Sequence, residues 1–381
     1  MTNKQNDGDH DTQASAGSEK KQLEALRQRI DSVDEQLQEL ISERARCVLE
    51  VARVKLAHLK EGEDVTYYRP EREAQILRKV MSGNSGPLKS EEMARLFREI
   101  MSACLALEQP VRVAYLGPEG TFTQQAALKH FGHSAVAVSL PAIDDVFREV
   151  ASGAANYGVV PVENSTEGVV THTLDNFLEN SARICGEVVL RIHHNLLVSD
   201  VTRTSSITRI YSHAQSLSQC RKWIDANFPG VERIAVPSNS EAARRIKGEW
   251  NAAAIAGEMA AELYDLVSFA RNIEDQPDNS TRFLIIGQEE VGPSGDDKTS
   301  IVVSTKNQPG ALHDLLEPFH RNSIDLTRVE TRPSRNGVWN YVFFIDFSGH
   351  CHDDLVNKTL NEVRERVSDV RVLGSYPRGV L

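Results

Sequence analysis

The hydrophobic residues of the first part of the chain recur with a helical heptad period from about residue 20 to residue 58. With Leu23 as the first core position, the a and d positions are Leu23, Leu26, Ile30, Val33, Leu37, Leu40, Arg44, Cys47, Val51 and Val54. The segment contains no glycine or proline, so the pattern predicts one helix about 55 Å long. Such a rod needs a partner for its apolar stripe, and we expect a homodimer, or a higher oligomer, that pairs these helices.

Further along the chain, the periodicity predicts two shorter helices, one beginning near Pro70 and one from about Ser90 to Glu108, after a turn at 61–66. From residue 111 the pattern changes. Short apolar segments ("VRVAYL", "YGVVPV", "RIYSHA", "AAAIAG") are each followed by a polar turn and a helical pattern, which is typical of an α/β domain. After the polar segment "EEVGPSGDDK" the order βαββαβ, with Asn336-Gly337 as a hairpin turn, predicts a small ferredoxin-like α+β unit.

These changes of pattern predict a multidomain protein, as its 381 residues allow. The first residues are polar and rich in Gly, Ser and Asp, which favours disorder. The expected divisions are a disordered tail (1–19), an all-α domain (20–109), an α/β domain (111–288), a linker (289–298) and the α+β unit (299–381).

Composition narrows the possible partners and cofactors. The formal charge is −11, which argues against a nucleic-acid or anionic-membrane partner. No apolar run approaches the roughly 20 residues of a membrane span. The five cysteines are scattered, without CxxC or a Cys/His ligand spacing, so we expect reduced thiols, a cytoplasmic location and no metal. "GPEGTF" is neither a dinucleotide nor a nucleotide-binding loop, and we expect no cofactor.

Arg44 interrupts the apolar stripe of the long helix. A guanidinium stays charged in a protein, so at a buried position it needs an anionic partner. Lys55 lies 11 residues later, close to three helical turns, and the two cations share a face about 16 Å apart. Both can reach one small anion. The alternative for Lys55 and Arg27 is a solvated position beside a coiled-coil seam.

Residues 20 to 109 resemble the all-helical class of chorismate mutase through "LEALRQRIDSVDEQLQELISERARCVLEVARVK", "YYRPERE" and "RLFREIMSACLALEQ". The resemblance implies a rearrangement of chorismate to prephenate that needs no nucleophile, only a compact substrate conformer and hydrogen bonds to the ether oxygen. It implies that Arg27 of one chain completes the site of the other chain, and that Lys55 and Glu108 donate hydrogen bonds to the ether oxygen. The implied site residues are Arg27, Arg44, Lys55, Arg72, Glu73 and Glu108.

Two positions depart from the best-known bifunctional relative, which has glutamine in place of Glu108 and aspartate in place of Arg69. Glu108 can donate only when protonated, so we predict that its pKa is raised and that mutase activity declines as pH rises. Glu108→Gln should remove that decline. With Arg69 at the aspartate position, Glu73 is the remaining candidate for binding the substrate hydroxyl, and Cys104, in place of a serine, is expected to serve packing.

Residues 111 to 288 resemble prephenate dehydratase through "GPEGTF", "PVENSTEG", "YSHAQ" and "NSTRF" in this order. The resemblance implies two lobes like a type II solute-binding protein, with the site in the cleft. Thr281 is implied as a donor to the departing hydroxyl, and Arg282 as the partner of the retained carboxylate. We expect structural roles for His193, His194 and His213. The implied site residues are Asn164, Ser212, Gln219, Thr281 and Arg282, with Thr121 as a lesser candidate.

"NQPGALHDLLEPF" and "VETRP" resemble the phenylalanine-binding motifs of an ACT domain. The resemblance implies feedback inhibition by L-phenylalanine, bound between the ACT domains of two chains. The implied residues are Gly310, Ala311, Leu312, Glu330, Thr331, Arg332 and Pro333.

Taken together, the three resemblances imply a member of the bifunctional chorismate mutase/prephenate dehydratase family, which converts chorismate through prephenate to phenylpyruvate. Two alternatives stay open. Arogenate, which carries an amino group on the side chain, is a possible substrate of the second site, and parallel kinetics on arogenate and prephenate would separate them. A non-catalytic amino-acid-sensing protein is the alternative from another class. The absence of a dinucleotide-binding loop disfavours a dehydrogenase.

Overall fold

The computed structural model describes residues 9–58, 68–305, 308–333 and 341–381. The chain divides into two compact units, one before Tyr68 and one from Tyr68 to Leu381. The first unit is the helix α1 (Asp9–Ala57). It confirms the helix predicted from the heptad pattern but begins at Asp9, so the predicted disorder of residues 9–19 is wrong. The predicted turn at 61–66 lies outside the described residues.

The apolar stripe of α1 is exposed in the single chain. Its large a and d side chains are between 47% and 67% exposed: Leu23, Leu26, Ile30, Val33, Leu37, Leu40, Val51 and Val54. Arg44 is half-buried, and its Nη1 atom is buried without a hydrogen-bond partner among the described residues.

The second unit begins with the helix pair α2 (Pro70–Gly83) and α3 (Ser90–Glu108), both as predicted. Pro70 occupies the first turn of α2, where its missing N–H does no harm. The pair packs through the buried side chains of Leu77, Ala94 and Met101, and Val380 and Leu381 lie against this small core.

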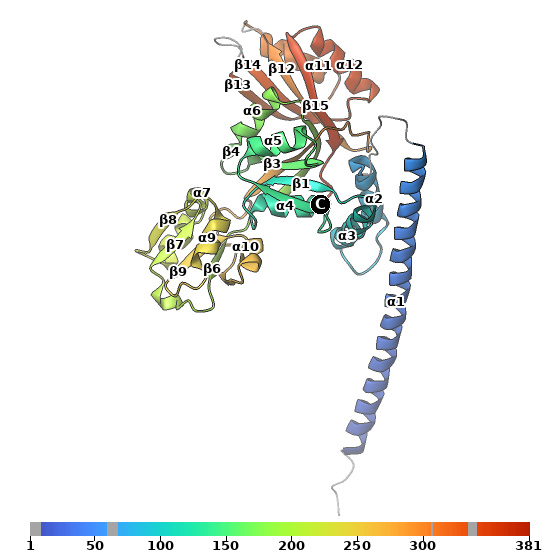
Figure 1. Ribbon diagram of the computed structural model, residues 1–381, viewed down its shortest axis with the longest axis vertical. Helices are drawn as coiled ribbons and strands as arrows, with labels where there is room; N and C mark the ends of the chain where they lie inside the picture. Colours follow the sequence, from blue (N-terminus) through green and yellow to red (C-terminus); the bar gives the residue numbers. More distant parts are fainter. Residues whose placement is uncertain (1–8, 59–67, 306–307, 334–340) are drawn as a thin grey trace, which may run out of the picture. The chain divides into compact units, whose positions relative to one another are not determined.

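The first α/β lobe is a sheet of order β2-β1-β3-β11-β5, with β4 paired to β3 (Figure 1). Strands β1, β2 and β3 are parallel, whereas β11 runs antiparallel to both of its neighbours. Its strands are β1 (Arg112–Leu116), β2 (Val136–Leu140), β3 (Tyr157–Asn164), β4 (Gly168–Val169), β5 (Arg183–Arg191) and β11 (Ser280–Gly287), and its helices are α4 (Phe122–Phe131), α5 (Ile143–Ala151) and α6 (Thr171–Glu179).

The second lobe is inserted in the chain between β5 and β11, and its sheet has the order β10-β6-β9-β7-β8. The central strand β9 consists of four alanines and an isoleucine, all fully buried, and such small side chains let the helices approach the sheet closely. The lobe comprises β6 (Asn195–Val198), η1 (Thr204–Ser206), β7 (Arg209–Ser212), α7 (Ala214–Gln219), α8 (Arg221–Asn227), β8 (Glu232–Ala235), α9 (Asn239–Ile246), β9 (Ala252–Ala256), α10 (Glu258–Leu263) and β10 (Val267–Ala270).

The last domain has the predicted order βαββαβ, with an antiparallel sheet β13-β14-β12-β15. The Asn336-Gly337 turn lies outside the described residues. The elements are β12 (Asp297–Thr305), α11 (Ala311–Arg321), β13 (Leu326–Pro333), β14 (Tyr341–Ser348), α12 (Asp354–Arg364) and β15 (Asp369–Pro377).

Strand β15 of this domain packs on β5 of the first lobe at backbone distance. A Cβ atom on Gly374 would lie 2.1 Å from the carbonyl oxygen of Ile184, so only glycine fits there. The fold therefore brings the last sheet directly against the sheet that contains β11 (Figure 1).

Two predictions about chemistry can be compared with the structure. All five cysteines lie in the described part of the chain and are unpaired. None of the described helices combines the length and the apolar character that crossing a membrane requires.

Candidate active sites

A cavity of about 230 Å³ lies between the two α/β lobes. It brings together Asn164 at the end of β3, Thr281 at the start of β11, Gln219 at the end of α7, and Thr121 before α4. These four residues were all implied by sequence. The other lining residues are Leu116, Gly117, Gly120, Phe122, Thr123, Ile192, His194, His213, Gln215, Ser216, Pro237, Ser238, Asn239 and Gly257.

The hydroxyl of Thr281 is oriented by Asn164, its partner in the β3–β11 ladder. The Nδ2 atom of Asn164 donates to Thr281 Oγ1 at 2.8 Å. The Oδ1 atom of Asn164 accepts the backbone N–H groups of Thr166 and Glu167, both at 3.0 Å, which fixes the orientation of the amide. Because the Thr281 oxygen accepts a hydrogen bond, its own proton is available for a group in the cavity.

A chain of hydrogen bonds continues from Asn164 across to the second lobe. Asn164 Nδ2 donates to Asn279 Oδ1 at 3.0 Å, and Asn279 Nδ2 donates to Gln219 Oε1 at 3.0 Å. The same Gln219 oxygen lies 2.9 Å from His194 Nε2, which must be the donor. Asn279 is buried and was quoted only as part of "NSTRF". Its role as the link between the lobes could not be read from the motif.

Two buried polar atoms at the cavity have no partner among the described residues, Gln219 Nε2 and His194 Nδ1. Burial lowers the pKa of His194, so the ring is neutral near pH 7 and, with Nε2 as donor, Nδ1 is an acceptor. An unpaired donor and an unpaired acceptor in a buried wall are unfavourable unless a ligand or water satisfies them. The place of His194 in the cavity wall is seen only in the structure, since nothing in the sequence distinguishes it from His193. The His193 side chain instead pairs with Glu274 at 2.8 Å.

The cavity is polar but contains no cationic side chain: of the described residues that line it, none is arginine or lysine. Its positive potential comes from helix ends. Phe122 and Thr123 begin α4, and the Thr121 side chain donates to the Pro118 carbonyl instead of capping that helix. Asn239 begins α9, where the Ser238 hydroxyl already accepts the N–H of Glu241. The uncapped backbone N–H groups at the start of α4 suit a carboxylate.

Ser212 does not line the cavity. It is fully buried, and its Oγ lies 2.8 Å from the Ile255 carbonyl oxygen and 2.9 Å from Asn239 Oδ1. Asn239 in turn donates to Ser216 at 2.9 Å, and both of these residues face the cavity. Ser212 therefore supports the wall from behind, and direct substrate binding by Ser212 stays a prediction that this geometry does not favour.

Arg282 does not line the cavity, and binding of the substrate carboxylate by Arg282 stays a prediction that this geometry does not favour. Successive strand residues point to opposite faces of a sheet, so Arg282 faces away from the cavity that Thr281 lines. Its guanidinium contacts Glu187 at 2.8 Å, Asp346 at 2.6 Å and the Tyr376 hydroxyl at 3.0 Å. The motif shows that Thr281 and Arg282 are adjacent in sequence. The alternation of side chains along a strand places them on opposite faces of the sheet.

The residues implied for the first reaction are divided between the two units. Arg27, Arg44 and Lys55 lie on α1, whereas the second unit holds the other three. The remaining residues are Arg72 and Glu73 on α2 and Glu108 at the end of α3.

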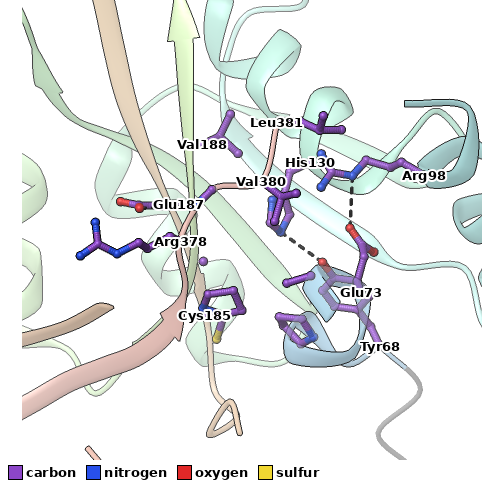
Figure 2. A pocket seen from close by; sticks show the side chains of 15 residues that line it. Tyr68, Glu73, Arg98, His130, Cys185, Glu187, Val188, Arg378, Val380 and Leu381 are labelled. Carbon is purple, nitrogen blue, oxygen red and sulfur yellow. Dashed lines mark hydrogen bonds and ion pairs between the residues drawn. The ribbon is translucent and has the colours of Figure 1, made fainter. Parts of the chain in front are cut away.

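Glu73 lies in a small buried pocket of the second unit, shown in Figure 2, and pairs with Arg98 at 3.2 Å. Burial raises the pKa of Glu73 despite this pairing. On the same wall the Tyr68 hydroxyl lies 3.1 Å from His130 Nε2. Val380 and Leu381, the last two residues of the sequence, also line this pocket. Arg72 lies outside it.

The implied phenylalanine-binding residues lie in two places in the last domain. Gly310, in the left-handed conformation with φ of 86°, precedes α11, where glycine is favoured. Glu330, Thr331 and Pro333 lie on β13, an edge strand of the sheet. Arg332 makes a bidentate pair with Asp175 of α6, with contacts of 2.9 and 3.0 Å. Ala311 and Leu312 form the first turn of α11, where Leu312 is 44% exposed.

One group could be considered for a metal: His350, Cys351 and His352, whose ligand atoms lie within 4.8 Å of one another. Both ring nitrogens of His350 are already engaged, Nε2 with the Val291 carbonyl at 2.9 Å and Nδ1 with the backbone N–H of His352 at 3.1 Å. Cys351 Sγ also contacts His350 Nδ1 at 4.0 Å, so the group offers fewer ligand atoms than a structural zinc site uses.

Comparisons with known proteins agree with this arrangement. Three family models match: chorismate mutase type II over residues 26–109, prephenate dehydratase over 113–291 and the ACT domain over 299–365. The bifunctional chorismate mutase/prephenate dehydratase of Pseudomonas aeruginosa is 67% identical over 94% of this chain and 99% of its own length. That of Stutzerimonas stutzeri is 66% identical over 96% of this chain and its whole length.

Among solved structures, the prephenate dehydratase of Arthrobacter aurescens in complex with L-Phe is similar, with a TM-score of 0.65 and 32% identity over 70% of this chain and 90% of that one. The two-lobed α/β fold and the ACT domain found here correspond to that enzyme and its relatives. The chain belongs to the family of bifunctional chorismate mutase/prephenate dehydratases.

Proposed function

We propose that the cavity between the lobes dehydrates prephenate and that Thr281 is the donor to the departing hydroxyl. The supporting observation is the 2.8 Å hydrogen bond from Asn164, which leaves the Thr281 proton free to be donated. In the reaction the bond to the ring carboxylate breaks and its electron pair enters the ring. The C–O bond then breaks, and the hydroxyl leaves as water once it receives a proton. Carbon dioxide and phenylpyruvate are the other products.

The retained carboxylate of the substrate has polar partners in the same cavity without Arg282. The start of α4 at Phe122 and Thr123 offers backbone N–H groups, and Gln219 Nε2 is an unpaired donor. A neutral His194 accepts through Nδ1, which suits a hydroxyl or water. These groups fit prephenate and arogenate alike, so parallel kinetics on the two substrates decides the preference.

The experiment that tests this assignment supplies prephenate directly and measures phenylpyruvate. Thr281→Val keeps the shape of the side chain and removes the hydroxyl, so dehydratase activity should be lost while mutase activity on chorismate remains. Retained dehydratase activity would remove Thr281 from the mechanism.

For the mutase reaction we propose a site shared between two chains. The exposed stripe of α1 supports a paired rod, and the buried, unpartnered Nη1 of Arg44 supports an anionic ligand. Arg44 would bind a carboxylate of chorismate, with Arg27 from the second chain. Lys55 and Glu108 would donate to the ether oxygen, and Arg72 and Glu73 would complete the site.

A complementation experiment tests the shared site. Arg27→Ala and Arg44→Ala chains should each be inactive as mutases. In mixed dimers one of the two sites is intact, so random mixing should restore about a quarter of the wild-type mutase activity. No recovery on mixing, with heterodimers demonstrated, would place both residues in a site made by one chain.

We further propose that L-phenylalanine inhibits the dehydratase by binding at the ACT domain. The exposed edge strand β13 carries Glu330, Thr331 and Pro333, and an edge strand can pair with that of a second chain. The domain limits proposed for this scheme are 20–109, 111–288 and 299–381. Calorimetric binding of phenylalanine together with its effect on dehydratase rate tests the claim.

A further inference from the structure

Six polar side chains form a buried cluster between the first α/β lobe and the ACT sheet. We call it the Arg282 cluster, and it consists of Glu187, Arg282, Lys298, Ser300, Asp346 and Tyr376. The side chains of its charged members are between 6% and 13% exposed, and Tyr376 is fully buried. The cluster contains two cations and two carboxylates, so its charges balance without any ligand.

The lobe and the ACT domain contribute to the Arg282 cluster from both sides. The lobe supplies Arg282 on β11 and Glu187 on β5, which contact each other at 2.8 Å. From the ACT side, Asp346 accepts from Arg282 at 2.6 Å, and Lys298 donates to Glu187 at 2.7 Å.

A second set of contacts closes the cluster within the ACT sheet. Ser300 Oγ donates to Asp346 Oδ1 at 2.6 Å and lies 2.7 Å from the Tyr376 hydroxyl. The hydroxyl of Tyr376 also accepts from Arg282 at 3.0 Å. Each of the three guanidinium nitrogens of Arg282 thus donates to a partner in the cluster, and the planar guanidinium holds these partners in one geometry.

The pairing between β11 and β3 is irregular at this point. Arg282 pairs with Glu163 and Phe283 with Pro161, so Val162 of β3 is an extra residue, one pair beyond Thr281–Asn164. Such a bulge interrupts the ladder and bends the strand that contains it, here β3, and bulges are frequent beside active sites. Because the ladder to β3 is interrupted next to Arg282, the side-chain contacts of Arg282 contribute more to the position of β11.

The ACT side of the cluster adjoins the strand with the implied phenylalanine motif. Asp346 lies on β14, which pairs with β13 along its length, and Glu330 of that motif is opposite Phe344. A shift of β13 against a second chain is therefore carried by the ladder to Asp346.

We propose that Arg282 is a positioning residue through which the ACT sheet sets the aim of Thr281. The proposal rests on the inhibition by phenylalanine proposed above and names its route: β13, β14, Asp346, Arg282 and the segment of β11 opposite the bulge in β3. A displaced Asp346 moves the Arg282 guanidinium, shifts β11 where its ladder to β3 is interrupted, and moves the Thr281 hydroxyl out of line with the substrate.

The test uses the full-length protein and two mild variants on the ACT side, Tyr376→Phe and Asp346→Asn. Each is measured for dehydratase rate with and without phenylalanine, for phenylalanine binding by calorimetry, and for mutase rate as a check of folding. We expect both variants to bind phenylalanine and to keep dehydratase kcat within about threefold of wild type. The phenylalanine concentration for half inhibition should rise about tenfold or more, within the range usual for allosteric coupling.

Arg183→Gln is the matched control, because Arg183 also lies on β5 and pairs with Glu290 at 2.7 Å, but this pair is exposed. It should respond to phenylalanine like wild type. If wild type binds phenylalanine without inhibition, the proposed regulation fails and the inference with it. If wild type is inhibited and Tyr376→Phe is inhibited equally at the same occupancy, the inference alone is overturned. Should Asp346→Asn fail to fold, Tyr376→Phe, which removes one oxygen and no charge, decides the question.

Discussion

The hydrogen bond from Asn164 to Thr281 leads to a quantitative prediction for Asn164→Asp. The substitution keeps an oxygen for the N–H groups of Thr166 and Glu167, so the turn after β3 is preserved. It replaces the amide donor with an acceptor opposite Thr281 Oγ1 and Asn279 Oδ1. The Thr281 hydroxyl must then donate to the new carboxylate, and its proton is no longer available to the substrate.

Proton donation by a positioned group is typically worth 10²- to 10⁴-fold in rate. We therefore expect dehydratase kcat to fall by about that factor, which corresponds to about 3 to 5 kcal/mol at roughly 1.4 kcal/mol per decade. Lowering the pH should restore part of the activity, because a protonated carboxyl can again donate to Thr281. Prephenate is supplied directly and phenylpyruvate is measured, with the mutase rate on chorismate as the control for folding.

The double variant Asn164→Asp with Thr281→Val separates two explanations. If Asn164 acts through Thr281, the double variant should be no slower than Thr281→Val alone, since residues that act as one unit are not additive. Two losses that multiply would refute the reasoning, as would an Asn164→Asp enzyme with wild-type kcat.

Three further predictions concern other parts of the chain. Arg44→Ala should abolish mutase activity and leave the dehydratase rate largely intact, whereas loss of both activities would mean that Arg44 mainly maintains the dimer. Gly374→Ala places a Cβ atom 2.1 Å from the Ile184 carbonyl oxygen and should lower the free energy of unfolding by about 3 kcal/mol or more. An unchanged urea midpoint would contradict the close packing of β15 on β5. Burial lowers the pKa of His130 to about 3 in the folded protein, below the roughly 6.5 of the unfolded chain. The neutral ring therefore contributes stability above pH 6.5, and this contribution is lost as pH falls, by about 1.4 kcal/mol per pH unit. The free energy of urea unfolding between pH 7 and 5 should depend less on pH for His130→Gln than for wild type.

The sequence predicted the elements well where a single strong period was present. The heptads of α1, the proline that opens α2 and the order βαββαβ of the last domain were all readable, because local patterning decides them. The start of α1 was not, because residues 9–19 carry few apolar side chains and one glycine, and nothing in their pattern requires a helix.

The dehydratase site was only partly predictable. Motif matching placed Asn164, Gln219 and Thr281 together, and the cavity contains all three. It did not separate Arg282 from the cavity, although the alternation of strand side chains was a signal that Thr281 and Arg282 face opposite sides of the sheet. It also missed the links made by Asn279 and His194, since these depend on how two distant segments meet at the boundary of the lobes.

The insertion of the second lobe between β5 and β11 has a consequence during synthesis on the ribosome. Strand β11 lies between β3 and β5 in the sheet, yet it is made about 90 residues after β5. At a synthesis rate of about 5 to 20 residues per second, β3 and β5 lack β11 between them for on the order of 5 to 20 s. During this time their unpaired edges and apolar faces can contact other chains. The second lobe, which is contiguous, can close first. The nascent enzyme is therefore most exposed to aggregation in the interval before the strand that carries Thr281 emerges.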